Sequence, residues 1–310
     1  MRFFDLHCDT LYEMATKNKD IYKNDLDVSI EKSLEYKPYI GCFAVWILDN
    51  LRGEKAFEFF KRCARLLNDF EIKYKNKFKI CRTIDDLKSI TSLKNSGVLL
   101  TVEGSAVIAG NISNVEYLSK SGVKIMTLTW NGSCEAGDGI EINNSRGLTK
   151  FGKDLVKEME KYSIIVDVSH ASEKLFYDVC SIATKPFIAT HSNSKTICDH
   201  KRNISDEQFK YIRDIGGIVG LNLCEYFLSN SKESGFESFL KHMEHFLSLD
   251  GENTISIGSD FDGATMPKDI YGLESIKKLY EYLLKKNYSE SLLDKIFFSN
   301  AYNFVSKFFQ

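Results

Sequence analysis

The chain has 310 residues, of which 43% are hydrophobic and 27% charged, and its formal net charge at pH 7 is −2. This composition is typical of a soluble globular protein and not of a disordered one. The nearly balanced charge argues against broad electrostatic binding to nucleic acid or to an anionic membrane surface. No segment approaches the roughly 20 apolar residues that a membrane span requires, and we expect no signal peptide before residue 7.

The eight cysteines form no CxxC pair and no framework spacing. In a chain of this length they are typical of reduced, mostly buried thiols, which predicts a cytoplasmic location. The sequence contains no repeat, no low-complexity tract and no linker. We therefore expect residues 1–310 to form a single domain, at a length that barrel folds commonly use.

Eight short apolar runs, rich in β-branched residues, each end in polar residues. Because they are nearly continuous and do not alternate strictly, they predict strands that are covered on both faces, as in a parallel sheet. The runs lie at 2–9, 39–48, 96–104, 123–130, 163–170, 186–192, 216–223 and 254–261.

Helical patterns lie between many of these runs. Thr149 and Ser172 are expected N-caps, and Ser205 has capping-box spacing to Gln208. The expected helices cover 54–76, 150 to about 162, 173 to about 182, a segment after Ser205, 234–249, 273–286 and 289–308. The connections 10–38 and 77–95 show no clear pattern. Alternation of strands and helices with eight strand candidates predicts a (β/α)8 TIM barrel, with a flavodoxin-like sheet as the alternative.

The first expected strand leads directly into His7 and Asp9. Side chains two residues apart in a strand point to the same side of the sheet, so this imidazole and carboxylate are expected side by side. Both are typical metal ligands. The pair alone is weak evidence, but the other strand ends repeat the pattern.

In a TIM barrel the functional groups lie at the carboxyl ends of the strands. Five of the other seven expected strands end at or beside Glu103, Trp130, His170, His191 and Asp260. Three imidazoles and three carboxylates suit two metal ions that share a carboxylate bridge, and such ions would activate a water molecule for attack. Nitrogen and oxygen ligands favour Zn²⁺, with Mn²⁺ and Fe²⁺ as alternatives.

The structural alternative is that these residues only form hydrogen bonds. An isolated histidine at a strand end is more often structural, and the aspartate of SDFDG can serve a turn. Three of six histidines at the ends of apolar runs favour the metal hypothesis. His200, His242 and His245 lie in loop or helical surroundings, and we expect them at the surface.

A series of motifs along the chain, taken together and in their order, resembles the membrane dipeptidase family (renal dipeptidase-like, peptidase family M19). The resemblance extends from residue 2 to about 305. Its motifs are DLHCDT at 5–10, VEG at 102–104, GLTKFGKDLVKEM at 147–159, IIVDVSHAS at 164–172, ATHSNSKTICDHKRN at 189–203, IGSDFDG at 257–263 and SNAYNFV at 299–305.

The resemblance implies a metal-dependent barrel of the amidohydrolase type that holds two zinc ions and forms a homodimer. His7, Asp9 and Glu103 match the ligands of one zinc ion. Glu103, His170 and His191 match the ligands of the other, so that Glu103 is the bridge.

Two further matches concern the substrate. Arg202 corresponds to the family arginine that holds the substrate carboxylate, a task that suits its planar guanidinium. Asp260 corresponds to the acidic residue that contacts the bridging water or the substrate amine and transfers the proton.

The sequence departs from the family pattern at the fourth expected strand. The family often has LTH there, with a histidine that binds substrate, whereas this chain has Trp130 followed by Asn131. Tryptophan donates one hydrogen bond but carries no titratable charge. Asn131 is the nearest replacement donor, so both residues are expected at the substrate.

The resulting hypothesis is a cytoplasmic zinc dipeptidase whose substrates include dipeptides with a C-terminal D-residue. Two alternatives are a hydrolase of small acylated amino acids on the same dimetal site and a metal-binding protein without hydrolase activity.

Overall fold

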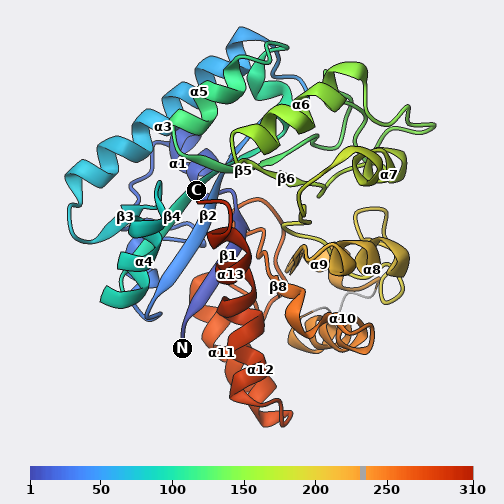
Figure 1. The fold of residues 1–310 in the computed structure, drawn as a ribbon. Helices are drawn as coiled ribbons and strands as arrows, with labels where there is room; N and C mark the ends of the chain where they lie inside the picture. The colour runs from blue at the N-terminus through green and yellow to red at the C-terminus, as the bar shows by residue number, and fades with distance from the viewer. Residues whose placement is uncertain (231–234, 310) are drawn as a thin grey trace.

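A curled sheet of parallel strands, surrounded by helices, forms the centre of the protein (Figure 1). The computed structural model describes residues 1–230 and 235–309. The strands are β1 (Phe3–Cys8), β2 (Tyr39–Trp46), β3 (Phe78–Ile80), β4 (Ser96–Glu103), β5 (Val123–Thr127), β6 (Ile165–Asp167), β7 (Val219–Leu221) and β8 (Ile255–Ile257). Their order is β6-β5-β4-β2-β1-β8-β7, and β3 pairs with the first half of β4.

The segment 186–192 closes this sheet into a barrel. Ile188 forms a parallel bridge with Asp167 of β6, and Ala189 forms one with Val219 of β7. The prediction of a (β/α)8 barrel is therefore confirmed. The prediction of a regular strand at 186–192 is wrong, because the Thr190 N–H donates to the Asp167 side chain (2.9 Å) and the ladder is interrupted there.

The helices cover the outside of the sheet (Figure 1). They are α1 (Thr10–Lys17), α2 (Ile30–Ser33), α3 (Glu54–Lys73), α4 (Ile84–Leu93), α5 (Asn114–Lys120), α6 (Lys150–Lys161), α7 (Glu173–Ile182), α8 (Asp206–Asp214), α9 (Glu225–Leu228), α10 (Phe236–Ser248), α11 (Leu273–Lys285), α12 (Glu290–Asp294) and α13 (Asn300–Ser306). Three short turns are η1 (Ser105–Ile108), η2 (Gly251–Asn253) and the π-helical η3 (Lys295–Ser299).

The expected caps of α6, α7 and α8 are confirmed. Thr149 and Ser172 accept hydrogen bonds from the first turn of their helices, and Ser205 forms a capping box with Gln208. The expected helix at 234–249 begins at Phe236, and residue 234 lies outside the described residues. The expected helix at 289–308 is divided into α12, η3 and α13.

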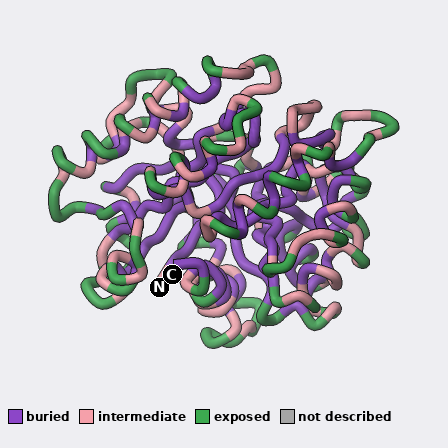
Figure 2. The backbone as a smooth tube through the Cα atoms, turned by 45° about the horizontal axis from the view of Figure 1, so that its top comes forward, coloured by how far each residue is buried: buried purple, intermediate pink, exposed green. Residues whose placement is uncertain are grey.

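The inner face of the barrel changes from apolar to polar along β4 and β6. In β4, Leu99 belongs to the inner apolar cluster, and Thr101 and Glu103 follow on the same side at intervals of two residues. Ile165 and Asp167 of β6 repeat this order, and both are buried. The centre of the molecule is buried throughout (Figure 2). Polar groups therefore gather at the carboxyl ends of the strands.

The C-terminal helix closes the opposite end of the barrel. Phe298, Phe304 and Phe308 belong to the same apolar cluster as Phe4 and Ile40, the second residues of β1 and β2. The amino ends of the strands are thus covered by the end of the chain, and the carboxyl ends remain for the site.

His242 corrects one prediction. It was expected at the surface, but it is completely buried. Its Nδ1 accepts the Ser194 N–H (3.1 Å), and its Nε2 donates to the Leu228 carbonyl (3.0 Å). A helical position does not by itself indicate exposure, and here α10 turns this side chain towards the barrel loops.

Candidate metal centre

Six of the expected site residues meet at the carboxyl ends of the strands. Glu103 is the last residue of β4. The others lie in β1, in the closing segment 186–192, or within three residues after β1, β6 and β8. His170 and Asp260 have positive φ values of 65° and 64°. Residues other than glycine rarely adopt this conformation, so the backbone turns sharply where these two side chains enter the site.

Glu103 stands between the histidines. Its Oε1 lies 2.7 Å from His170 Nε2 and 3.5 Å from His191 Nε2, and its Oε2 lies 3.8 Å from His7 Nε2. His7 Nε2 also lies 3.5 Å from Asp9 Oδ2. The two carboxylate oxygens therefore face two different sets of ligand atoms.

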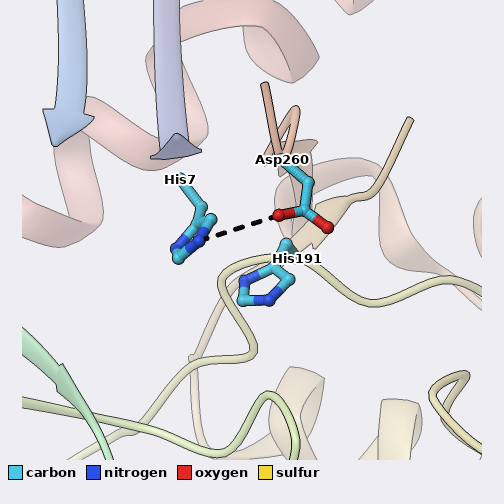
Figure 3. A group of neighbouring side chains, drawn as sticks. All are labelled: His7, His191 and Asp260. Atoms are coloured by element: carbon cyan, nitrogen blue, oxygen red, sulfur yellow. Dashed lines mark ion pairs between the residues drawn. The ribbon is translucent and has the colours of Figure 1, made fainter. Parts of the chain in front are cut away.

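Asp260 approaches the same centre from the end of β8. Its Oδ1 lies 3.8 Å from His7 Nε2, and the rings of His7 and His191 are stacked with centroids 3.9 Å apart (Figure 3). In three overlapping groups, the candidate ligand atoms all lie within 4.8 Å of one another. These groups are His7, Asp9 and Glu103; Glu103, His170 and His191; and His7, His191 and Asp260.

The electrostatics of this cluster favour a bound cation. His7 Nε2 and Asp9 Oδ1 are buried without a hydrogen-bond partner among the described residues. Burial raises the pKa of Glu103 well above its ordinary value, and the nearby Asp9 carboxylate adds to this. Burial lowers the pKa of His7, but the carboxylates of Glu103 and Asp9 outweigh it and raise this pKa to about 10. The carboxylates thus require positive charge nearby.

The other two histidines remain neutral. Burial lowers the pKa values of His170 and His191 well below the ordinary range, and the positive Arg202 lowers them further. Neutral imidazoles and ionised carboxylates are the forms that bind divalent cations. Cys224 lines the same cavity, but burial raises the pKa of its thiol to about 12, so it remains protonated. The residues therefore fit divalent metal ions held by nitrogen and oxygen.

A layer of buried polar residues holds the ligands from below. Asp167 accepts hydrogen bonds from Thr127 Oγ1 (2.6 Å), from the Ser169 N–H (3.0 Å) and from both the N–H (2.9 Å) and Oγ1 (2.6 Å) of Thr190. Thr190 Oγ1 also lies 2.8 Å from His191 Nδ1. This layer was not predicted, although Thr190 directly precedes the predicted ligand His191 and Asp167 lies three residues before the predicted ligand His170.

Asp260 is held in a similar way. Asn222 Nδ2 donates to Asp260 Oδ2 (2.9 Å), and Asn222 Oδ1 accepts the Cys224 N–H (2.7 Å), which fixes the orientation of the amide. Beneath it, Asp5 accepts hydrogen bonds from the Ser259 N–H and hydroxyl. The expected strand ending at 223 was one of two with no site residue assigned, and Asn222 occupies that place.

A cavity of about 270 Å³ opens onto the cluster. Asp9, Glu103, His170 and Asp260 lie on its wall. Aromatic side chains form much of the remaining wall: Trp46, Trp130, Tyr226 and Phe227. A polar inner end and an aromatic wall suit a small molecule with an amide group and apolar side chains.

Arg202 lies deeper, next to His191. Its guanidinium is buried, one Nη donates to the His191 carbonyl (3.3 Å), and its Nε has no partner among the residues that the structure describes. It borders a second cavity of about 160 Å³, which His170 and Ser192 also line. An unpaired buried N–H group beside the cluster is available to bind a carboxylate.

Trp130 and Asn131 both reach the cavity, as expected of residues at the end of that strand. Trp130 packs against Trp46 with ring centroids 4.9 Å apart. The Asn131 side chain lies against His170, with Oδ1 2.7 Å from His170 Nδ1.

Buried carboxylates around neutral imidazoles, at the carboxyl ends of a parallel barrel, define a metal-dependent hydrolase. Comparison with known proteins names the family. The family model described as "Membrane dipeptidase (Peptidase family M19)" matches residues 1–307. The chain belongs to this family and is a metallopeptidase of the dipeptidase type.

Similar proteins agree with this assignment. A metallopeptidase from Rhodobacter sphaeroides, solved with a phosphinate mimic of the dipeptide L-Ala-D-Ala, has a TM-score of 0.92 and 25% identity, covering 100% of this chain and 99% of that one. The family M19 dipeptidase AC has a TM-score of 0.93 and 27% identity, with the same coverage.

Curated sequences include an uncharacterised protein from the pqqA 5′ region of Klebsiella pneumoniae, which is 29% identical over 72% of this chain and 86% of its own length. The matches to three further curated relatives span 48% to 59% of their lengths. Among the described residues, no helix combines the length and the apolar character needed to cross a membrane.

Proposed function

We propose that this dipeptidase acts with two zinc ions that share Glu103. The observation that carries this proposal is the position of the Glu103 carboxylate, with Oε1 beside His170 and Oε2 facing His7. His7, Asp9 and Glu103 would hold one ion, and Glu103, His170 and His191 the other. Nitrogen and oxygen donors without thiolate support zinc over softer metals. Bound zinc would polarise the scissile carbonyl and make a water molecule acidic enough to attack at neutral pH.

Arg202 would bind the C-terminal carboxylate of the dipeptide. Its buried guanidinium has an unpaired Nε and borders the second cavity, which His170 also lines, so a carboxylate there gains charge-assisted hydrogen bonds in a dry environment. A longer peptide would bring an uncharged amide to this position and leave the arginine unpaired, which is costly. This contact would restrict the enzyme to short substrates.

Asp260 would manage the protons and the substrate amine. Asn222 holds Oδ2, which leaves Oδ1 directed towards His7 and the reacting centre. From this position Oδ1 would accept the proton of the attacking water and deliver it to the nitrogen that leaves when the amide C–N bond breaks. The same carboxylate would pair with the positively charged amino terminus of the substrate.

Trp130 and Asn131 would contact the substrate at the scissile amide. Trp130 and Trp46 form an aromatic wall, and the Asn131 amide N–H₂ would donate to the carbonyl oxygen as negative charge develops there. The Rhodobacter neighbour was solved with a mimic of L-Ala-D-Ala. We extend this to a substrate class that includes dipeptides with a C-terminal D-residue.

The test is a dipeptide panel run together with metal analysis. Purified protein should contain about two zinc ions per chain and hydrolyse dipeptides, including L,D-isomers, but not tripeptides. Activity confined to acylated amino acids would refute the proposed dipeptide substrates and indicate instead that the same metal site hydrolyses small acylated amino acids. Glu103→Gln should lose both metal and activity, and full activity in this variant would refute the mechanism.

Arg202→Lys tests the carboxylate contact separately. It should raise KM by about 10-fold to 100-fold, because a hydrogen bond to a charged group contributes about 1.5–3 kcal/mol. The effect should disappear for substrates whose C-terminal carboxylate is replaced by an amide, which bind weakly in either protein.

We also propose a cytoplasmic homodimer. All eight cysteines are free, as expected in a reducing compartment. The homodimer rests on the family resemblance. Cell fractionation and light scattering of the purified protein test the two statements, and a membrane-bound or monomeric protein would refute them.

A further inference from the structure

Asn131 holds one of the candidate ligands by a hydrogen bond. Its Oδ1 lies 2.7 Å from His170 Nδ1, on the side of the ring opposite Glu103. A neutral imidazole has a proton on one nitrogen and a lone pair on the other. Because the amide oxygen only accepts, the proton lies on Nδ1, and the Nε2 lone pair faces Glu103 and His191.

His191 is held in the same tautomer by a different group. Thr190 has a single hydroxyl proton, which it donates to Asp167 Oδ2 (2.6 Å). Its oxygen therefore accepts from His191 Nδ1 (2.8 Å). Both histidines of this ligand set thus direct the Nε2 lone pair to the same point, with their Nε2 atoms 2.9 Å apart.

The backbone of Asn131 is clamped to that of His170. The Ile140 N–H donates to the His170 carbonyl and the Glu141 N–H donates to the Asn131 carbonyl, both at 2.9 Å. Gly139 allows this close approach, since a Cβ there would lie 2.0 Å from the Trp130 carbonyl oxygen. Two consecutive residues of one loop therefore fix the distance between Asn131 and His170.

We propose that Asn131 is a positioning residue of the metal centre, which sets the tautomer and the ring orientation of His170. The proposal rests on the proposed metal site. With Oδ1 engaged by His170, the amide is oriented, and no hydrogen bond of the described chain uses its Nδ2. That N–H₂ group is left for the substrate. Asn131, and not Trp130, then carries the polar contact at this strand end.

Two substitutions distinguish the role of Asn131 Oδ1, which accepts from His170, from the role of the Asn131 N–H₂ group, which is left for the substrate. Asn131→Leu removes both, whereas Asn131→Asp keeps an acceptor for His170 and loses the N–H₂. The matched control is Asn114→Leu, because Asn114 is also half-buried and its amide also makes one hydrogen bond, to the Ile108 carbonyl. Zinc affinity is measured by titrating metal-free protein against a competing chromophoric chelator.

Asn131→Leu should weaken the affinity for zinc by about 10-fold to 100-fold, the usual effect of losing a hydrogen bond to a metal-binding histidine. Asn131→Asp should bind zinc at least as tightly as the unmodified protein, with impaired hydrolysis, and Asn114→Leu should bind it normally. Normal binding by Asn131→Leu, or equal loss in both Asn131 variants, would overturn the proposal. Failure of the unmodified protein to bind zinc would refute the proposed function instead.

A second measurement does not depend on the folding of Asn131→Leu. In zinc-loaded, ¹⁵N-labelled protein, His170 should show a slowly exchanging Nδ1 proton. Its resonance should shift in Asn131→Asp, because a carboxylate is a stronger acceptor. A rapidly exchanging proton, or an unshifted resonance, would contradict the contact.

Discussion

Gly263 lies against the candidate metal centre, and no side chain would fit at its position. A Cβ at this position would lie 1.9 Å from Asp9 Oδ2 and 3.0 Å from Asp260 Oδ1. The turn after β8 therefore brings its backbone directly against two carboxylates of the site. At the scale of single residues, the metal centre therefore also depends on a residue whose side chain offers no ligand atom.

We therefore predict that Gly263→Ala displaces Asp9 and weakens zinc binding by about 10-fold or more, comparable to the loss of an outer contact. The metal titration described above measures this. Gly216→Ala is the control, since Gly216 has open space around it and a φ of +74°. It should lower stability and leave zinc affinity unchanged, and equal zinc loss in both variants would indicate a general effect on folding.

His242 predicts a pH dependence of stability. Burial lowers its pKa from 6.5 to about 4, so the folded chain excludes a proton that the unfolded chain binds. The part of the free energy of unfolding that depends on neutral His242 is fully present above pH 6.5. It is lost as the pH falls towards 4, and the whole loss is about 3 kcal/mol. Urea unfolding across this range should show a steeper loss for the unmodified protein than for His242→Gln, and parallel curves would contradict it.

At the scale of elements, the strand ends carry the site and α13 seals the other end of the barrel. Phe304 of α13 is buried in the inner apolar cluster, whereas Asn303 beside it is exposed. Phe304→Ala should lower the free energy of unfolding by about 3–5 kcal/mol, because it leaves a cavity in a closed core. Asn303→Ala should change it by less than about 0.5 kcal/mol, as a surface substitution. Urea titration of the two variants checks both values.

The sequence predicted the strand ends well because each apolar run stops where polar side chains must begin. It did not predict β3 and α4, since Phe78 and Ile80 make only a short alternating run. Thr83 and Asp86 do form a capping box there, and this signal was present in the sequence. The observed roles of Asn131, Thr190 and Asn222 were beyond prediction, because each depends on a contact with a residue distant in the sequence: His170, Asp167 and Asp260, respectively.

At the scale of the whole molecule, the five proposed zinc ligands come from residues 7 to 191, and the unfolded chain does not hold them together. Zinc should therefore bind only the folded state and stabilise it, by about 4 kcal/mol when free zinc exceeds Kd a thousandfold. A chelator should lower Tm, and added zinc should restore it. An unchanged Tm after verified metal removal would contradict this prediction.

The two ends of the polypeptide meet in the finished barrel. Arg2 pairs with Asp294, and Phe4 shares its apolar cluster with the terminal aromatic residues. During synthesis, β1 emerges from the ribosome before β8 and α13, with which it packs in the barrel. Closure of the barrel, and with it completion of the proposed metal site, must therefore wait until β8 and α13 have been synthesised, and until then the first strands expose apolar surface that favours aggregation.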